Sequence, residues 1–177
     1  MCDIIMFSIL PLSVLLIVGT ANHLMGIFVT QKTLAEHRPP LSDVIHDHMP
    51  IIDAIYVHII FFIHFGSFIW YAFYDCQHLS NLYYRVSYFL SFMMSFRLVT
   101  TMVTSYPNAR SCESASFGTY CGDMMFSGHA LFMTTIYLAY HFYKGHDSLL
   151  WHAIHFAFTL TGLILLIITR MHYTNDV

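Results

Sequence analysis

Charged residues are scarce in this chain. Lys and Arg together number 7 and Asp and Glu 10 among 177 residues, whereas 57% of the residues are hydrophobic and 17% are aromatic. Soluble domains average about 25% charged residues, so the 10% found here excludes an ordinary soluble globular protein. The net charge of −3 also gives no basic surplus for nucleic acid. We therefore expect an integral membrane protein without a nucleic-acid partner.

Five apolar segments are long enough to cross a hydrocarbon core of about 30 Å at about 1.5 Å per residue. They cover residues 4–30, 54–74, 86–106, 124–143 and 148–169, and four of them contain no Asp, Glu, Lys or Arg. The third contains Arg97, which we expect to face the bundle interior and to serve function, because an intramembrane arginine is costly. The sequence predicts an all-α, polytopic membrane helix bundle with about five transmembrane helices, forming one domain over residues 1–177.

Two polar motifs lie where apolar segments meet loops: CGDMMFSGH at Cys121 to His129 and HYTND at His172 to Asp176. If the five helices alternate in direction, both motifs fall on the same side of the membrane. The short link at 144–147 predicts antiparallel packing of the last two helices, which brings His129 towards His172. If this end is helical, Asp176 lies one turn from His172, where its carboxylate fixes the ring tautomer and raises its basicity.

An anion site is expected beside these histidines. Ser127 and Gly128 allow a close backbone turn at a helix N-terminus, where free N–H groups and the helix dipole favour phosphate. Arg97 adds a positive group from the helix that ends on this side. Together these groups indicate phosphoryl transfer. The candidate catalytic residues are His129, His172 and Asp176, and the candidate substrate-binding residues are Arg97, Ser127, Gly128 and Asp123.

Four motifs in this order resemble the sphingomyelin synthase family, a branch of the type 2 phosphatidic acid phosphatase superfamily. PPLSD at Pro39 to Asp43 resembles the first family motif, with Ser42 in place of a proline. CGDMMFSGH resembles the third, with Ala130 where threonine is usual, and HYTNDV resembles the fourth. The residues similar to the second motif are Arg97, Thr100, Thr104 and Pro107.

The resemblance implies a transferase that moves a phosphocholine-type headgroup from a glycerophospholipid, typically phosphatidylcholine, to ceramide, giving sphingomyelin and diacylglycerol. His172 would attack the donor phosphorus with Asp176 orienting its ring, and His129 would act as acid and then as base. The resemblance implies no metal and no other cofactor. The expected partners are membrane lipids: ceramide, phosphatidylcholine or phosphatidylethanolamine, and diacylglycerol. Whether choline, ethanolamine or inositol phosphate is transferred stays open.

The location of the site is a further expectation. The family implies a multi-pass protein of the Golgi or plasma membrane, with its active site facing the lumen or the cell exterior. The positive-inside rule favours the opposite orientation, because four basic residues lie on the motif side. These residues are Lys32, Arg38, Arg110 and Arg170. We follow the family here, since a cationic phosphate site weakens the topological meaning of these charges.

Several alternatives accompany this reading. The family core has six helices, and the sixth is expected to be missing from a chain that ends at Val177. A truncated, inactive lipid-binding or regulatory protein, associated with itself or with a full-length relative, is therefore the second hypothesis. Lipid phosphatases would carry a Lys-x6-Arg-Pro element and an arginine where this chain has Leu166. A histidine-box metal site is disfavoured, because His152 and His155 lie near the opposite helix end from His172. Cys112 and Cys121 are either paired or free thiols.

Overall fold

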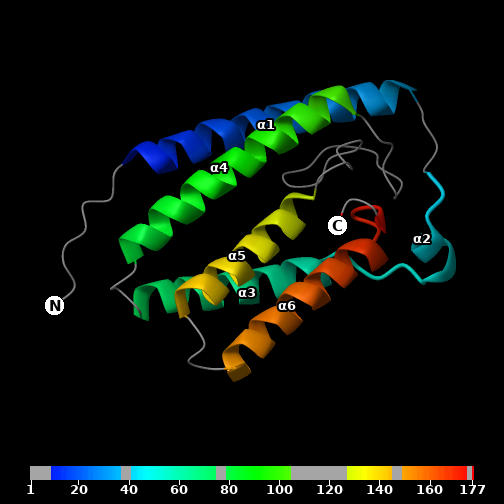
Figure 1. Cartoon of the computed structure of the whole chain (residues 1–177). Helices are drawn as coiled ribbons and strands as arrows, with labels where there is room; N and C mark the ends of the chain where they lie inside the picture. Colours follow the sequence, from blue (N-terminus) through cyan, green and yellow to red (C-terminus); the bar gives the residue numbers. More distant parts are fainter. Residues whose placement is uncertain (1–8, 37–40, 75–78, 105–126, 145–148, 175–176) are drawn as a thin grey trace.

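The described part of the chain is a bundle of helices (Figure 1). The computed structural model describes residues 9–36, 41–74, 79–104, 127–144, 149–174 and 177. Its elements are α1 (Ile9–Glu36), α2 (Val44–His48), α3 (Ile55–Tyr74), α4 (Leu79–Val103), α5 (Gly128–Lys144) and α6 (Leu149–Ile168). No strand occurs in these residues, so the predicted all-α class is confirmed.

Four of the described helices are long and apolar enough to cross a membrane. They run over Ile9–Leu34, Ile55–Tyr74, Ser80–Val103 and Leu149–Ile168. The fourth predicted span, 124–143, corresponds to α5, which has 17 residues and is shorter than these four helices. At about 1.5 Å per residue such a helix rises about 26 Å, near the lower limit for a spanning helix of about 17–25 residues. The polytopic bundle is thus confirmed, with α5 as its shortest long helix.

Helix boundaries differ from the predicted ones where polar residues extend a helix beyond its apolar segment. α4 begins at Leu79 rather than at 86, and the Arg85 guanidinium in this added stretch lies over the Tyr143 ring of α5, 5.9 Å from its centroid. The α4 helix therefore includes residues 79–85, which are too polar for hydropathy to assign to the membrane-spanning segment. The short α2 was not predicted, because it lies in the polar stretch 31–53 between the first two apolar segments.

Two groups of helices pack together in the bundle. α1 packs mainly along α4, and Figure 1 shows the two running side by side. α5 contacts α3, α4 and α6 and therefore lies at the centre. One buried cluster joins α3, α4 and α5 through Phe68, Ala72, Leu82, Ile136 and Ala139. A second joins α3, α5 and α6 through Val57, Ala130, Met133 and Leu166.

The long helices alternate in direction, as predicted. In Figure 1, α1, α4 and α6 end on the same side of the bundle on which α3 and α5 begin. α2 lies on that side too and packs against α6. The side of the bundle that collects these helix ends is hereafter the motif side, since the polar motifs of the sequence map to it.

Candidate active site

Arg97 faces the bundle interior, as expected for an arginine within a spanning helix. Its side chain is buried in α4, and its Nη1 donates a hydrogen bond to Asn22 Oδ1 of α1 at 3.0 Å. Asn22 is itself fixed, because its Nδ2 donates to the carbonyls of Val18 and Met94 at 2.9 and 2.8 Å. The guanidinium is therefore held between α1 and α4 by a neutral amide, and this pair is not an ion pair.

The start of α5 lies next to this guanidinium. A Cβ placed on Gly128 would be 3.8 Å from Arg97 Nε, which brings the cation close to the first residue of the helix. Ser127 caps the helix: its Oγ accepts a hydrogen bond from the Ala130 amide at 3.2 Å, and its carbonyl accepts from Leu131 at 3.0 Å. The phosphate site at this helix N-terminus stays a prediction; the structure shows that the capped start of α5 and the Arg97 side chain lie next to each other.

His129 is the second residue of α5 and is partly buried against α3. Its ring centroid lies 5.5 Å from that of His58 at an interplanar angle of 58°. It also meets the Phe61 ring edge-on, with centroids 5.5 Å apart. No role was assigned to His58 from the sequence, so this neighbour was missed. His58 lies in the first turn of α3, which begins on the motif side. That position was the signal that could have placed His58 near His129.

His172 follows a turn that ends α6 with well-defined geometry. Arg170 has a φ of 55°, and the Arg170 and Met171 amides donate to the Ile167 and Leu166 carbonyls at 2.9 and 3.2 Å. This is the Schellman pattern, in which a left-handed residue closes the helix and satisfies its last carbonyls. The His172 amide also donates to the Leu166 carbonyl, at 3.3 Å, and its side chain is buried. The turn therefore directs His172 into the protein instead of into solvent.

The helix ends that carry the two histidines pack together. Ala130, which follows His129, is buried in one cluster with Leu166, and Met171, which precedes His172, packs against that cluster. Such contact between the start of α5 and the end of α6 is what the predicted antiparallel pairing requires. The structure thus gathers Arg97, Gly128 and both histidine segments on the motif side.

Some predicted site residues lie outside the described residues. They are Asp123 and Asp176 of the candidate site, together with Cys112 and Cys121. Within the described ranges, no three His, Cys, Asp or Glu side chains lie close enough to hold a metal ion. His155 stacks on Tyr140 with ring centroids 3.9 Å apart, so this histidine has an aromatic neighbour within the bundle.

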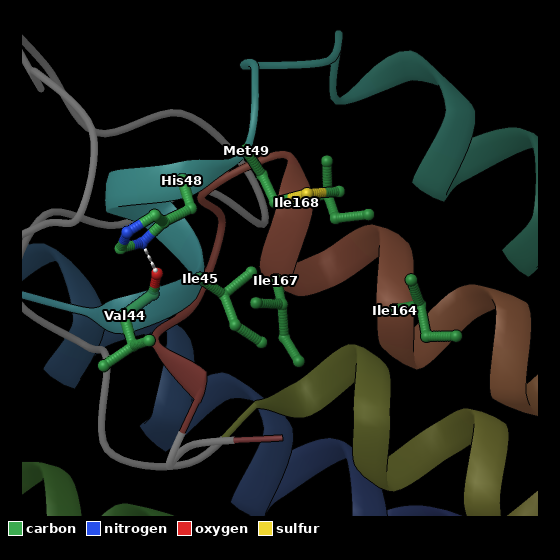
Figure 2. Close-up of a pocket in the computed structure, with 7 residues that line it drawn as sticks. All are labelled: Val44, Ile45, His48, Met49, Ile164, Ile167 and Ile168. Carbon is green, nitrogen blue, oxygen red and sulfur yellow. Dashed lines mark hydrogen bonds between the residues drawn. The ribbon is translucent and has the colours of Figure 1, made fainter.

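An apolar groove lies between α2 and the end of α6 (Figure 2). It has a volume of about 530 Å³, within the range of about 300–1,000 Å³ that small-molecule pockets occupy. In Figure 2, Ile45 lies close to Ile167 and Met49 lies close to Ile168, and the groove is also lined by Val44, His48 and Ile164. The His48 ring is held by a hydrogen bond from Nδ1 to the Val44 carbonyl at 2.7 Å. The groove suits an apolar ligand and adjoins the turn that carries His172.

Comparison with known proteins supports the motif reading. The family model described as PAP2 superfamily C-terminal matches residues 120–177. A Caenorhabditis elegans protein named "Putative phosphatidylcholine:ceramide cholinephosphotransferase 3" is 48% identical over 59 residues. That stretch is 32% of this chain and 17% of the relative, so the chain matches less than a fifth of the relative's length.

Part of the chain is therefore similar to the PAP2 superfamily and to a protein named as a cholinephosphotransferase. The predicted resemblance is therefore confirmed over residues 120–177, which hold the third and fourth motifs and match the PAP2 superfamily C-terminal model. Residues 120–177 include the capped start of α5 and the turn after α6, which hold His129 and His172. Arg97 and Asp43 lie outside the matched residues, so their part in the site depends on the geometry alone.

Proposed function

We propose that this chain transfers a phosphocholine-type headgroup from phosphatidylcholine to ceramide through a phosphohistidine at His172. The observation that carries the proposal is the packing of the His129 and His172 segments against each other, beside a buried arginine and a capped helix N-terminus. Two imidazoles and a cation are the groups that a double displacement at phosphorus needs. The apolar groove between α2 and the end of α6 supports lipid substrates.

The first displacement forms the enzyme-bound headgroup. A ring nitrogen of His172 attacks phosphorus and forms a P–N bond, while the bond from phosphorus to the diacylglycerol oxygen breaks. His129, as imidazolium, donates its proton to that oxygen, so diacylglycerol leaves neutral. Arg97 and the free amides at the start of α5 stabilise the negative charge on the remaining phosphoryl oxygens. Asp176, as the resemblance implies, orients the His172 ring.

The second displacement returns the enzyme to its starting state. His129, now neutral, takes the proton of the ceramide primary hydroxyl as its oxygen attacks phosphorus. A P–O bond forms, the P–N bond to His172 breaks, and sphingomyelin leaves. His129 is again an imidazolium and His172 again has a free ring nitrogen. We place this reaction at the Golgi or plasma membrane, on the lumenal or extracellular face, as the family resemblance implies.

A transfer assay in membranes that lack their own synthase tests the proposal. Fluorescent ceramide is offered with phosphatidylcholine, phosphatidylethanolamine or phosphatidylinositol, and the parent chain is compared with His172→Ala. His152→Ala is the matched control, because His152 lies in the first turns of α6 and contacts Tyr140 and His141, away from the motif side. A phosphosphingolipid made by the parent and the control but not by His172→Ala supports the transferase, and the productive donor identifies the headgroup.

The intermediate has a test of its own. Phosphatidylcholine labelled in its headgroup is mixed with the parent chain without ceramide, and the protein is denatured quickly. An acid-labile, base-stable label on the peptide that contains His172 is expected. If the protein is well inserted but forms neither product nor label, the catalytic proposal fails, and a non-catalytic lipid-binding protein becomes the better account.

A further inference from the structure

Asp43 carries more hydrogen bonds than a helix cap requires. Its Oδ1 accepts from the Ile45 and His46 amides at 3.0 and 3.3 Å, which caps the five-residue α2. The same carboxylate accepts from the Thr174 amide through Oδ2 at 2.7 Å and from the Thr174 hydroxyl through Oδ1 at 2.8 Å. Asp43 thus joins two segments that are 131 residues apart in the sequence.

Further hydrogen bonds fasten the same two segments on either side of His172. The Leu41 amide donates to the Tyr173 hydroxyl at 2.9 Å, and His46 Nε2 donates to the Ile167 carbonyl at 3.0 Å. The Arg170 guanidinium donates to the His46 carbonyl. Segment 41–48 is therefore hydrogen-bonded to residues 167–174 at several points. We call segment 41–48 the α2 clamp.

The position of His172 depends on this clamp because the helix no longer supports the chain there. The last bond from α6 to this turn ends at the His172 amide, which donates to the Leu166 carbonyl. Two residues later, the Thr174 amide is held by Asp43 and not by α6. His172 therefore lies between a backbone bond from α6 and the bonds from Asp43 to Thr174, and removal of the Asp43 carboxylate leaves the backbone at Thr174 without this support.

Asp43 is suited to this task because it is charged at neutral pH. Burial raises the pKa of Asp43, but the hydrogen bonds from Thr174 and from the His46 amide outweigh this effect and hold the pKa below its ordinary 3.8. Bonds from an amide and a hydroxyl to a charged carboxylate are roughly twice as strong as those between neutral groups. An asparagine at position 43 would place an NH₂ group next to one of these donors, and because NH₂ cannot accept a hydrogen bond, that bond would be lost.

We propose that Asp43 is a positioning residue for the headgroup transfer: through Thr174 it holds the His172 ring in line with the donor phosphorus. The inference depends on the proposed function, in which His172 is the nucleophile. The inference also assigns a role to the first motif, PPLSD, which of the four motifs lies farthest in sequence from His172. Misplacement of a reacting group by about 1 Å can cost about 100-fold in rate.

Asp43→Asn tests this, with Asp53→Asn as the matched control. Asp53 also caps a helix on the motif side, since its Oδ1 accepts from the Ile55 amide at 2.9 Å. For Asp43→Asn we expect kcat per folded protein to fall about 10- to 100-fold, with the KM for ceramide unchanged. Asp53→Asn should leave both kcat per folded protein and the KM for ceramide unchanged. A merely structural role of Asp43 would lower the amount of folded protein but leave kcat per folded protein intact.

A second readout is independent of activity. His172 is 6% exposed, so its modification by diethylpyrocarbonate, followed by mass spectrometry of its peptide, should be slow in the parent. Asp43→Asn should speed it several-fold, and Asp53→Asn should not. If the parent makes no product, the proposed function has failed, while this labelling still decides whether Asp43 fixes His172. Labelling and kcat in Asp43→Asn that match those in Asp53→Asn would overturn the inference.

Thr174→Val covers the case in which Asp43→Asn does not fold. It removes the hydroxyl bond and leaves the α2 cap and the Thr174 amide in place. We expect kcat to fall about two- to tenfold, in proportion to one hydrogen bond. An unchanged kcat and unchanged His172 labelling in Thr174→Val would contradict the role of this contact.

Discussion

Gly162 lies where α6 packs closely against Met133 of α5. A Cβ built on it would overlap Met133 Sδ, and it would lie 3.0 Å from Met133 Cε and 3.5 Å from Ile60 Cγ2. Met133 is fully buried, so the end of its side chain would have to shift within the core. We expect Gly162→Ala to overpack this interface at a cost of about 1–3 kcal/mol. The better helix preference of alanine offsets about 0.5–1 kcal/mol of that cost.

Gly66 in α3 provides the matched control, because no atom lies within 4 Å of a Cβ built on it. Gly66→Ala should gain the same helix preference without any overlap. The difference in unfolding free energy between the two variants therefore isolates the overlap, and we expect about 1–3 kcal/mol. At about 2–4 °C per kcal/mol for a chain of this size, that corresponds to a Tm lower by roughly 2–12 °C.

Thermal unfolding in detergent micelles measures this difference, and the headgroup-transfer assay measures its consequence. Met133 lies four residues after His129 in α5, so a displaced Met133 shifts the helix face that carries His129, and kcat should fall as well. In a Met133→Ala background the cost of Gly162→Ala should vanish, because Sδ and Cε are gone. If Gly162→Ala melts at or above Gly66→Ala, or if its cost persists in that background, the steric argument is wrong.

Three other substitutions test separate parts of the structure. Asn22→Leu removes the bond to Arg97 and should lower the free energy of unfolding by about 1–3 kcal/mol; a denaturant titration that matches the parent would contradict this. His64→Phe should preserve that free energy or raise it by about 1–3 kcal/mol, because neither ring nitrogen of buried His64 has a hydrogen-bond partner among the described residues; a clear loss would refute it. The pKa of Asp43 is lowered in the folded state, so its stabilisation is present above the ordinary value of 3.8 and disappears as the pH falls through the folded-state value. Asp43→Asn should therefore flatten the decrease in Tm between about pH 6 and pH 3, and an unchanged slope would count against this carboxylate.

Hydropathy and motif order predicted the helical class, the alternating directions and the common side of the motifs. These features depend on local composition, and the structure confirms them in α1, α3, α4, α5 and α6. The exact helix ends were less predictable. Ser127 was expected to contribute to phosphate binding, and its side chain also caps α5, which sets the start of the helix at Gly128.

Contacts between distant residues were beyond sequence reasoning. Asp43 preceding a short apolar run is a fair local signal for a helix cap, yet its bond to Thr174 depends on how α6 ends. The turn there uses a left-handed Arg170, a conformation that glycine usually supplies and that no pattern in this sequence indicates. His58 was likewise assigned no site role, because its closeness to His129 results from the packing of α3 on α5.

The α2 clamp has a consequence for the synthesis of the protein. Asp43 leaves the ribosome 131 residues before Thr174, its partner. At about 5–20 residues per second, roughly 7–26 s pass between the synthesis of Asp43 and that of Thr174, so their hydrogen bonds cannot form earlier. During that interval the spanning helices can already be inserted, while the segment that carries His172 does not yet exist. The geometry proposed for His172 therefore forms only after this later segment has been made, and a copy without that segment lacks the proposed nucleophile.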